Sequence, residues 1–308
     1  MKKLHRLLSS CIILIFFITG CNQTQSTLTP DNTIGTPEIT KGTETVTGPI
    51  STQTVEPTPP EPLVASVNDE GIWLSDYEAD VQRYLDAAAN LVKEVDENQA
   101  KELVLDTMIE TILLAQGARE SGFVLDQEMF TKKMEQLIID SGGENQFQQW
   151  LNQNNYSQVS FERIYRQQIE AVWMRDQIIS QVPTRAEQIR ARQVLVSSKA
   201  LADSIFNELE NGAEFDYYSW GYDQLSGGEL GWFPRDYLIL PEIEAAVFDL
   251  KPGEYTDVIQ STYGFHIVQV MERDLDRNLT QDALLQKQRI ALESWLTEKK
   301  ANSTIILK

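Results

Sequence analysis

Few side chains of this sequence could carry covalent chemistry. It contains two histidines and two cysteines, and His5 and Cys11 lie in or beside an apolar stretch near the N-terminus. His266 and Cys21 are the others, so a zinc site of the Cys/His type, which takes four ligands, is excluded. The sequence also lacks the Gly-x-Ser-x-Gly, Walker and dinucleotide glycine signatures. Nucleophilic, zinc-dependent and nucleotide-dependent reactions therefore have no support.

Acidic side chains are the second candidates for chemistry, as pairs of general acid and base. They give the 308-residue chain a formal charge of −20. In so acidic a chain most carboxylate pairs belong to solvated faces, and a glycosidase or acid–base hydrolase is unsupported. The same charge argues against a nucleic-acid partner, which needs a basic face. The length suits about two domains.

The N-terminal 21 residues have the pattern of a bacterial lipoprotein signal peptide. Basic residues at positions 2, 3 and 6 precede an apolar run over 7–18, which is shorter than the roughly 20 residues of a membrane span. Ile-Thr-Gly-Cys follows at 18–21 and resembles a lipobox, which predicts cleavage before Cys21 and its lipidation. The alternative is an ordinary signal peptide or short anchor with a chance cysteine. Cleavage before Cys21 would also remove Cys11, and a mature chain with a single cysteine forms no internal disulfide.

Two regions follow this segment. Residues 22–62 are rich in Thr, Pro, Gly and Ser and predict a disordered tether. Residues 63–182 predict a helical domain that opens with a short strand and turn over 64–71. Ser75 and Glu78 form a capping-box pattern for its first helix. Further helices are expected from 98 to about 122, at 127–139, at 144–154 and at 159–179.

The last third predicts a small α+β domain over 183–275 and a C-terminal segment over 276–308. We expect a strand at 192–196, a helix closed by Gly212, a glycine-bearing loop, a helix at 241–248 and strands at 255–259 and 266–271. Asn278 with Gln281 predicts the cap of a final helix. A strand at 304–307 has no neighbour in sequence, so we expect it to pair with 64–67.

Four short motifs follow one another between residues 228 and 268. They are Gly-Glu-Leu-Gly-Trp-Phe at 228–233, Glu-Ala-Ala-Val-Phe at 244–248, Leu-Lys-Pro-Gly-Glu at 250–254 and Tyr-Gly-Phe-His-Ile-Val at 263–268. Each is weak alone, but their order and spacing resemble the parvulin-type peptidyl-prolyl isomerases. The resemblance implies an α+β fold with a four-stranded antiparallel sheet, and a reaction that needs no cofactor.

The resemblance also implies a site. Its apolar members would be the residues lining a slot for the proline ring: Leu230, Ile239, Ile243, Trp232 and Phe233. His266 and Ser261 would belong to a polar network beneath the substrate amide. An X-Pro bond rotates over a barrier of about 18–20 kcal/mol, and such a slot helps by excluding water and favouring the twisted amide over the planar one.

Three positions depart from the parvulin pattern. Gln193 stands where relatives carry the first histidine of the strand Ala-x-His-Ile-Leu, and a Gln side chain hydrogen-bonds but does not titrate. Gly221 stands where relatives place an acidic residue or a cysteine after Ser219, which leaves Asp223 as a candidate for that role. Ile243 replaces a usual Phe, which keeps the slot apolar without a flat ring face.

Residues 63–182 and the final helix resemble the chaperone part of SurA- and PrsA-type foldases, through Val67-Asn68 and the helical layout. This resemblance implies binding of unfolded exported proteins, at a bacterial membrane outside the cytoplasm. Two hypotheses follow. The chain is a lipid-anchored isomerase whose polar network includes His266, Ser261, Gln193 and Asp223, or it is a catalytically weak holdase that keeps the parvulin fold.

Overall fold

The computed structural model describes residues 61–91 and 93–308. The expected signal peptide, the lipidation site Cys21 and nearly all of the expected tether lie outside these residues. The chain divides into two compact units. Unit one comprises the described residues up to Ile109, Leu125–Tyr165 and Ile305–Lys308, and unit two comprises Glu110–Val124 and Arg166–Thr304. The domain boundaries at 182/183 and 275/276 stay predictions.

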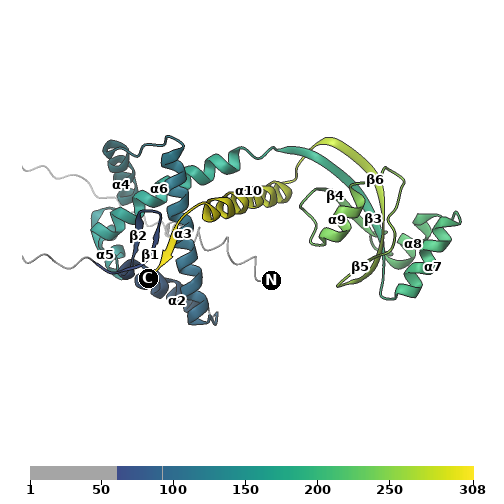
Figure 1. The fold of residues 1–308 in the computed structure, drawn as a ribbon, viewed down its shortest axis with the longest axis horizontal. Helices are drawn as coiled ribbons and strands as arrows, with labels where there is room; N and C mark the ends of the chain where they lie inside the picture. Colours follow the sequence, from purple (N-terminus) through teal and green to yellow (C-terminus); the bar gives the residue numbers. More distant parts are fainter. Residues whose placement is uncertain (1–60, 92) are drawn as a thin grey trace, which may run out of the picture. The chain divides into compact units, whose positions relative to one another are not determined.

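A small three-stranded sheet ties the end of the chain to the start of unit one. Strands β1 (Leu63–Val67), β2 (Glu70–Trp73) and β7 (Ile305–Leu307) are ordered β2-β1-β7. The expected pairing of 304–307 with 64–67 is confirmed, because β7 runs antiparallel to β1 (Figure 1). Ala65 and Val67 of β1 are fully buried, so this pairing closes part of the core of unit one.

The remaining elements up to Ser180 are helices. They are α2 (Leu74–Asn90), α3 (Glu97–Glu120), α4 (Gln127–Asp140), α5 (Glu144–Gln153) and α6 (Gln158–Ser180). Aromatic rings fill the core of unit one, with Phe161 edge-on to Phe147 at 5.3 Å and to Trp150 at 5.8 Å between ring centroids. Within the described ranges, every helix is too short or too polar to cross a membrane.

Two expected helix caps are wrong. Helix α2 already begins at Leu74, with Trp73 at the N-cap position, and the Ser75 hydroxyl donates to the Glu61 carboxylate instead. Strand β2 runs directly into α2, so no residue with a capping oxygen separates them. The final helix, α10 (Gln281–Ala301), is capped by Thr280, whose hydroxyl accepts the Ala283 N–H. Asn278 is still paired in strand β6.

Unit two contains the four-stranded antiparallel sheet that the sequence predicted. Its strands are β3 (Arg185–Val196), β4 (Glu229–Pro234), β5 (Ile259–Ser261) and β6 (Gly264–Asn278), in the order β4-β3-β6-β5. The sequence placed residues 229–234 in a loop because of the glycines at 227, 228 and 231, and that expectation is wrong. They form an edge strand with a bulge against Ala191 and Arg192.

The two faces of this sheet carry different helices. Helices α7 (Lys199–Glu210) and α8 (Phe215–Tyr222) cover one face, and α9 (Pro241–Val247) covers the other (Figure 1). Val194 and Ile267 belong to the core under α7 and α8. Ala191 and Val268 belong to the core under α9. Because side chains alternate along a strand, Gln193 and His266 fall on the α9 face.

Gly228 allows the glycine loop to reach β3. Its backbone lies at φ +70°, and a Cβ built there would be 1.9 Å from the Gln193 carbonyl oxygen. The Gln193 N–H donates to the Gly228 carbonyl oxygen at 2.8 Å. Gly231 has a similar φ of +73°, with nothing within 4 Å of the corresponding Cβ. The close approach at Gly228 therefore fixes the backbone of Gln193, one of the candidate site residues.

These two glycines form a matched pair for a stability test. Gly231→Ala should lower the unfolding free energy by about 1–2 kcal/mol, from the positive φ alone. Gly228→Ala should lower it by roughly 2–5 kcal/mol, because steric overlap with the Gln193 carbonyl adds to the same backbone strain. Urea unfolding of both variants measures the difference. Equal losses would show that the loop does not depend on this close approach.

Candidate functional site

His266 lies at the centre of a chain of side-chain hydrogen bonds. It stands on β6 with only 2% of its surface exposed. Its Nε2 is 2.7 Å from the Ser261 Oγ, and its Nδ1 is 2.8 Å from the Gln193 Oε1. The three residues come from three adjacent strands, β5, β6 and β3, so the sheet itself brings them together. Three of the four expected polar site residues therefore share one network.

The partners of His266 determine which ring nitrogen carries the proton. The Gln193 Oε1 can only accept, so the Nδ1 donates to it. The Ser261 Oγ accepts the Tyr263 N–H at 2.9 Å, which leaves the hydroxyl proton of Ser261 to donate to the Nε2. Both nitrogens of the ring are satisfied in the neutral state, and Gln193 takes over the role of fixing the tautomer.

Burial also favours the neutral ring. Desolvation lowers the pKa of His266 below its usual range, and the negative charge of Glu242 opposes this effect only partly. The imidazole is therefore uncharged at neutral pH. A neutral, hydrogen-bonded ring offers fixed dipoles to a substrate amide without placing a full charge in an apolar environment.

Asp223 lies apart from this network. It follows α8, and its carboxylate accepts the N–H groups of Leu225 at 3.0 Å, Ser226 at 3.2 Å and Gly228 at 3.3 Å. The hydroxyl of Ser226 and these backbone donors lower the pKa of Asp223. Asp223 thus shapes the loop that leads to Gly228. Gly221 lies within α8 with open space at its Cβ, so the helix itself does not require a glycine there.

The apolar candidates separate into three environments. Phe233 and Ile243 are 0% and 3% exposed, in the core beneath α9. Leu230 is half-buried at the edge of that core, and Ile239 is 89% exposed in the segment before α9. Trp232 points to the opposite face of β4 from Phe233, where Arg277 lies 4.2 Å above its ring. Leu230 and Ile239 are therefore the candidates placed to contact a substrate, and that role stays a prediction.

Two residues of this region were not predicted as site residues from the sequence. Tyr263 lies in the turn between Ser261 and His266 and is 67% exposed. Like Ile239, it presents a large side chain to solvent. Glu244 is buried, and its carboxylate accepts the N–H groups of Asp236, Tyr237 and Leu238. The signal for Glu244 was available, since an acidic residue within an apolar helical motif needs buried partners.

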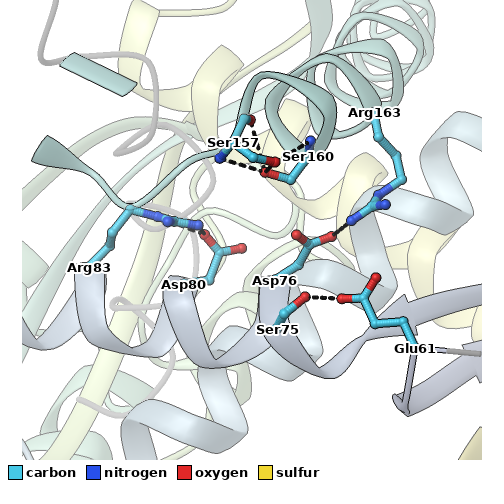
Figure 2. Close-up of polar contacts among 8 residues, drawn as sticks. All are labelled: Glu61, Ser75, Asp76, Asp80, Arg83, Ser157, Ser160 and Arg163. Carbon is cyan, nitrogen blue, oxygen red and sulfur yellow. Dashed lines mark hydrogen bonds and ion pairs between the residues drawn. The ribbon is translucent and has the colours of Figure 1, made fainter. Parts of the chain in front are cut away.

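Unit one contains a separate polar pocket of about 290 Å³ between α2 and the start of α6 (Figure 2). Asp76 pairs with Arg163, and Asp80 pairs with Arg83. The Arg83 guanidinium also lies 3.9 Å above the Tyr156 ring. Burial raises the pKa of Tyr156 and of Asp80, although Arg83 opposes the effect at Asp80. The Asp76–Arg163 pair joins α2 to α6, whereas the Asp80–Arg83 pair lies within α2, and both pairs neutralise their charges locally.

No metal site accompanies either region. Across residues 61–91 and 93–308, no group of three or more His, Cys, Asp or Glu side chains is placed to hold a metal ion. The His266 network itself offers a neutral imidazole, a hydroxyl and an amide, and the exposed Tyr263 donates its N–H to the Ser261 hydroxyl. Such an arrangement suits binding and distortion of a peptide group rather than bond cleavage.

The sheet order, the helices on its two faces and the hydrogen-bonded His266 define a parvulin-type peptidyl-prolyl isomerase domain. Comparison with known families agrees. The PPIC-type PPIase domain matches residues 173–274, and the SurA-like N-terminal domain matches residues 7–177. The second match spans more than half of the chain. The protein therefore belongs to the SurA-like family and contains a domain of the PPIC type.

Individual relatives cover different shares of the chain. The foldase protein PrsA of Bacillus subtilis is 32% identical over 108 residues, which are 32% of this chain and 37% of the relative. PrsA of Caldanaerobacter subterraneus is 25% identical over 228 residues, 67% of this chain and 72% of the relative. The crystal structure of PrsA from Bacillus anthracis is 24% identical, with a TM-score of 0.41, over 64% of this chain and 97% of that chain. The chain thus spans about a third of the first relative's length.

The lowered pKa of His266 predicts how stability depends on pH. The unfolded chain binds a proton at about pH 6.5, whereas the folded chain resists protonation until a lower pH. The contribution of His266 is thus complete above about pH 7 and declines as the pH falls through 6.5 toward the folded pKa. Urea unfolding between about pH 8 and pH 5 should show this loss in the wild type. His266→Gln, which cannot titrate, should lack that part of the slope, and parallel profiles would contradict the account.

Proposed function

We propose that this protein isomerises X-Pro bonds of exported proteins, holds those proteins while they fold, and is anchored outside the cytoplasm by a lipid on Cys21. The observation that carries the proposal is the Ser261–His266–Gln193 network, in which His266 is buried and Ser261 also accepts the N–H of the exposed Tyr263. The foldase and chaperone names of the relatives support clients that are unfolded proteins. The basic, apolar and Cys21-bearing N-terminal sequence supports export and anchoring.

Each group has a task in this reaction. Leu230 and Ile239 would cover the proline ring and exclude water from the X-Pro bond, which disfavours the polar planar amide relative to the twisted one. The amide nitrogen of Gln193 has no hydrogen-bond partner among the described residues, and its side chain is half-buried. It can therefore donate to the carbonyl oxygen of the substrate. Ser261 and His266 hold that amide in position.

This mechanism transfers no proton, which makes Gln193 compatible with catalysis. Twisting an amide requires the loss of resonance, not a change in protonation. A side chain that keeps the imidazole neutral and offers one N–H donor meets the requirement. Each 1.4 kcal/mol of preferential binding to the twisted amide gives about a tenfold rate increase.

A catalytically weak holdase is the second candidate. It is favoured by Gln193 and Gly221, the two positions that depart from the parvulin pattern. Under this alternative the apolar side chains around the network bind extended client segments without accelerating rotation. The folded domain and its hydrogen-bond network would be the same for an isomerase and for a holdase. Only a measurement of isomerase activity can therefore distinguish the two.

A proline-peptide isomerisation assay separates the two candidates. The wild type should accelerate cis–trans exchange, and Leu230→Ala should lower kcat/KM by about tenfold, because a wall of the slot is lost. Val124→Ala, at an exposed position, is the matched control and should leave the rate unchanged. Wild-type rates equal to those in buffer would refute catalysis. Turnover that appears only in Gln193→His would establish the holdase alternative.

The lipid anchor has its own test. When the full chain is expressed in a bacterium supplied with a labelled fatty acid, it should take up the label and sediment with membranes. Cys21→Ser should remove both properties, because the lipid is attached through that sulfur. Cys11→Ser serves as the control and should keep both. A Cys21→Ser protein that stays labelled would show that the attachment lies elsewhere.

A further inference from the structure

The segment between β4 and α9, residues 235–240, is held from within the isomerase domain. The Glu244 carboxylate accepts the N–H of Tyr237 at 2.9 Å and of Leu238 at 3.0 Å, and it also accepts the N–H of Asp236. Asp236 adopts a positive φ of +64°, which is uncommon for a residue other than glycine. We call residues 235–240 the slot loop, because it carries the exposed Ile239.

The same loop is held from outside the domain by helix α10. The Lys287 Nζ donates to the Arg235 carbonyl oxygen at 3.1 Å and lies 3.9 Å from the Asp236 carboxylate. The Gln286 Nε2 donates to the Asp236 carbonyl oxygen at 3.4 Å. The Lys287 side chain is only 22% exposed, whereas the Asp236 side chain is 66% exposed, so solvent and salt weaken the ion pair and the hydrogen bond to the Arg235 carbonyl is the firmer contact.

The other end of α10 packs into the helices of unit two. Leu296 belongs to a core cluster with Leu114 of α3 and Ala171 of α6. Gly117 makes room for the Trp295 ring, because a Cβ at that glycine would lie 2.6 Å from it. An ion pair of 2.8 Å between Lys300 and Glu110 closes the far end of the helix. One continuous helix therefore contacts both the helical core and the slot loop.

We propose that α10 positions the slot loop for substrate binding, with Lys287 as the positioning residue. This inference rests on the proposed function, in which Ile239 covers the proline ring. With Lys287 in place, the loop is ordered before the substrate arrives. Without it, part of the binding free energy would be spent on ordering the loop. The Ser261–His266–Gln193 network lies on other strands and would be unaffected.

Steady-state kinetics on the full chain test the role of Lys287. Lys287→Ala should raise KM for an X-Pro peptide by about two- to tenfold, while kcat changes less than about twofold, because the polar network is intact. Lys287→Arg should restore KM, since a guanidinium can reach the same carbonyl and carboxylate. Lys299→Ala, on the same helix and paired with Glu120, is the control and should keep the wild-type KM. An unchanged KM in Lys287→Ala would overturn the inference.

A second measurement separates this inference from the proposed function. Amide hydrogen exchange of Tyr237 and Leu238 reports the order of the slot loop whether or not the protein is active. Exchange at both amides should be faster in Lys287→Ala than in the wild type, and Lys299→Ala should leave it unchanged. Equal protection in Lys287→Ala and the wild type would refute the positioning role. A wild type without isomerase activity would refute catalysis and leave the exchange result to decide on the loop.

Discussion

The fold of the parvulin-type domain must supply hydrogen-bond partners for both ring nitrogens of a buried imidazole. His266 is almost fully enclosed, and an unpaired polar atom there would cost about 1–3 kcal/mol. Both of its nitrogens find partners because β3 and β5 flank β6, which aligns Gln193 and Ser261 with it. The position of Gln193 in turn depends on the backbone contact with Gly228, and Asp223 shapes the loop that delivers that glycine. A local requirement for hydrogen bonds thus extends through three strands, β5, β6 and β3, and the loop before β4.

This network explains how Gln193 can replace a histidine. In the parvulin pattern its position is a histidine, and its replacement raises the question of whether activity survives. The structure shows that the amide performs the structural part of the role by accepting the Nδ1–H of His266. It also leaves an N–H donor at a half-buried position. What the substitution removes is a titratable group, and amide rotation does not need one.

The ordered motifs were sufficient to predict the four-stranded sheet of unit two, because they contain glycines that the backbone requires and large side chains that fill the core. Gly228 is required by a close approach, and Phe233 and Phe248 fill the core. The pairing of β7 with β1 followed from a terminal strand that needed a neighbour. Positions decided by tertiary packing were missed. Strand β4 was missed because Gly231 and the glycines before it indicated a loop. The observed cap of the final helix, Thr280, lies two residues after the expected Asn278. The face on which Trp232 lies depends on the register of β4.

The site residues also divide into those that sequence motifs indicate and those whose role depends on the tertiary fold. The resemblance to the parvulins indicated His266 and Ser261, because both belong to or flank one of its motifs. It could not show that Asp223 serves the loop or that Ile239 is exposed, because these facts depend on where the loop folds. The contact of α10 with residues 235 and 236 lies about 50 residues away in sequence. No local pattern reports it.

The tautomer of His266 tests the central claim most directly. Nitrogen NMR of the imidazole ring distinguishes a protonated from an unprotonated nitrogen at each position, and His266→Gln identifies the signals. At pH 7 we expect a neutral ring with the proton on Nδ1, because Gln193 accepts there and Ser261 donates to Nε2. A ring protonated on Nε2 alone, or on both nitrogens, would contradict the hydrogen-bond chain on which this account rests.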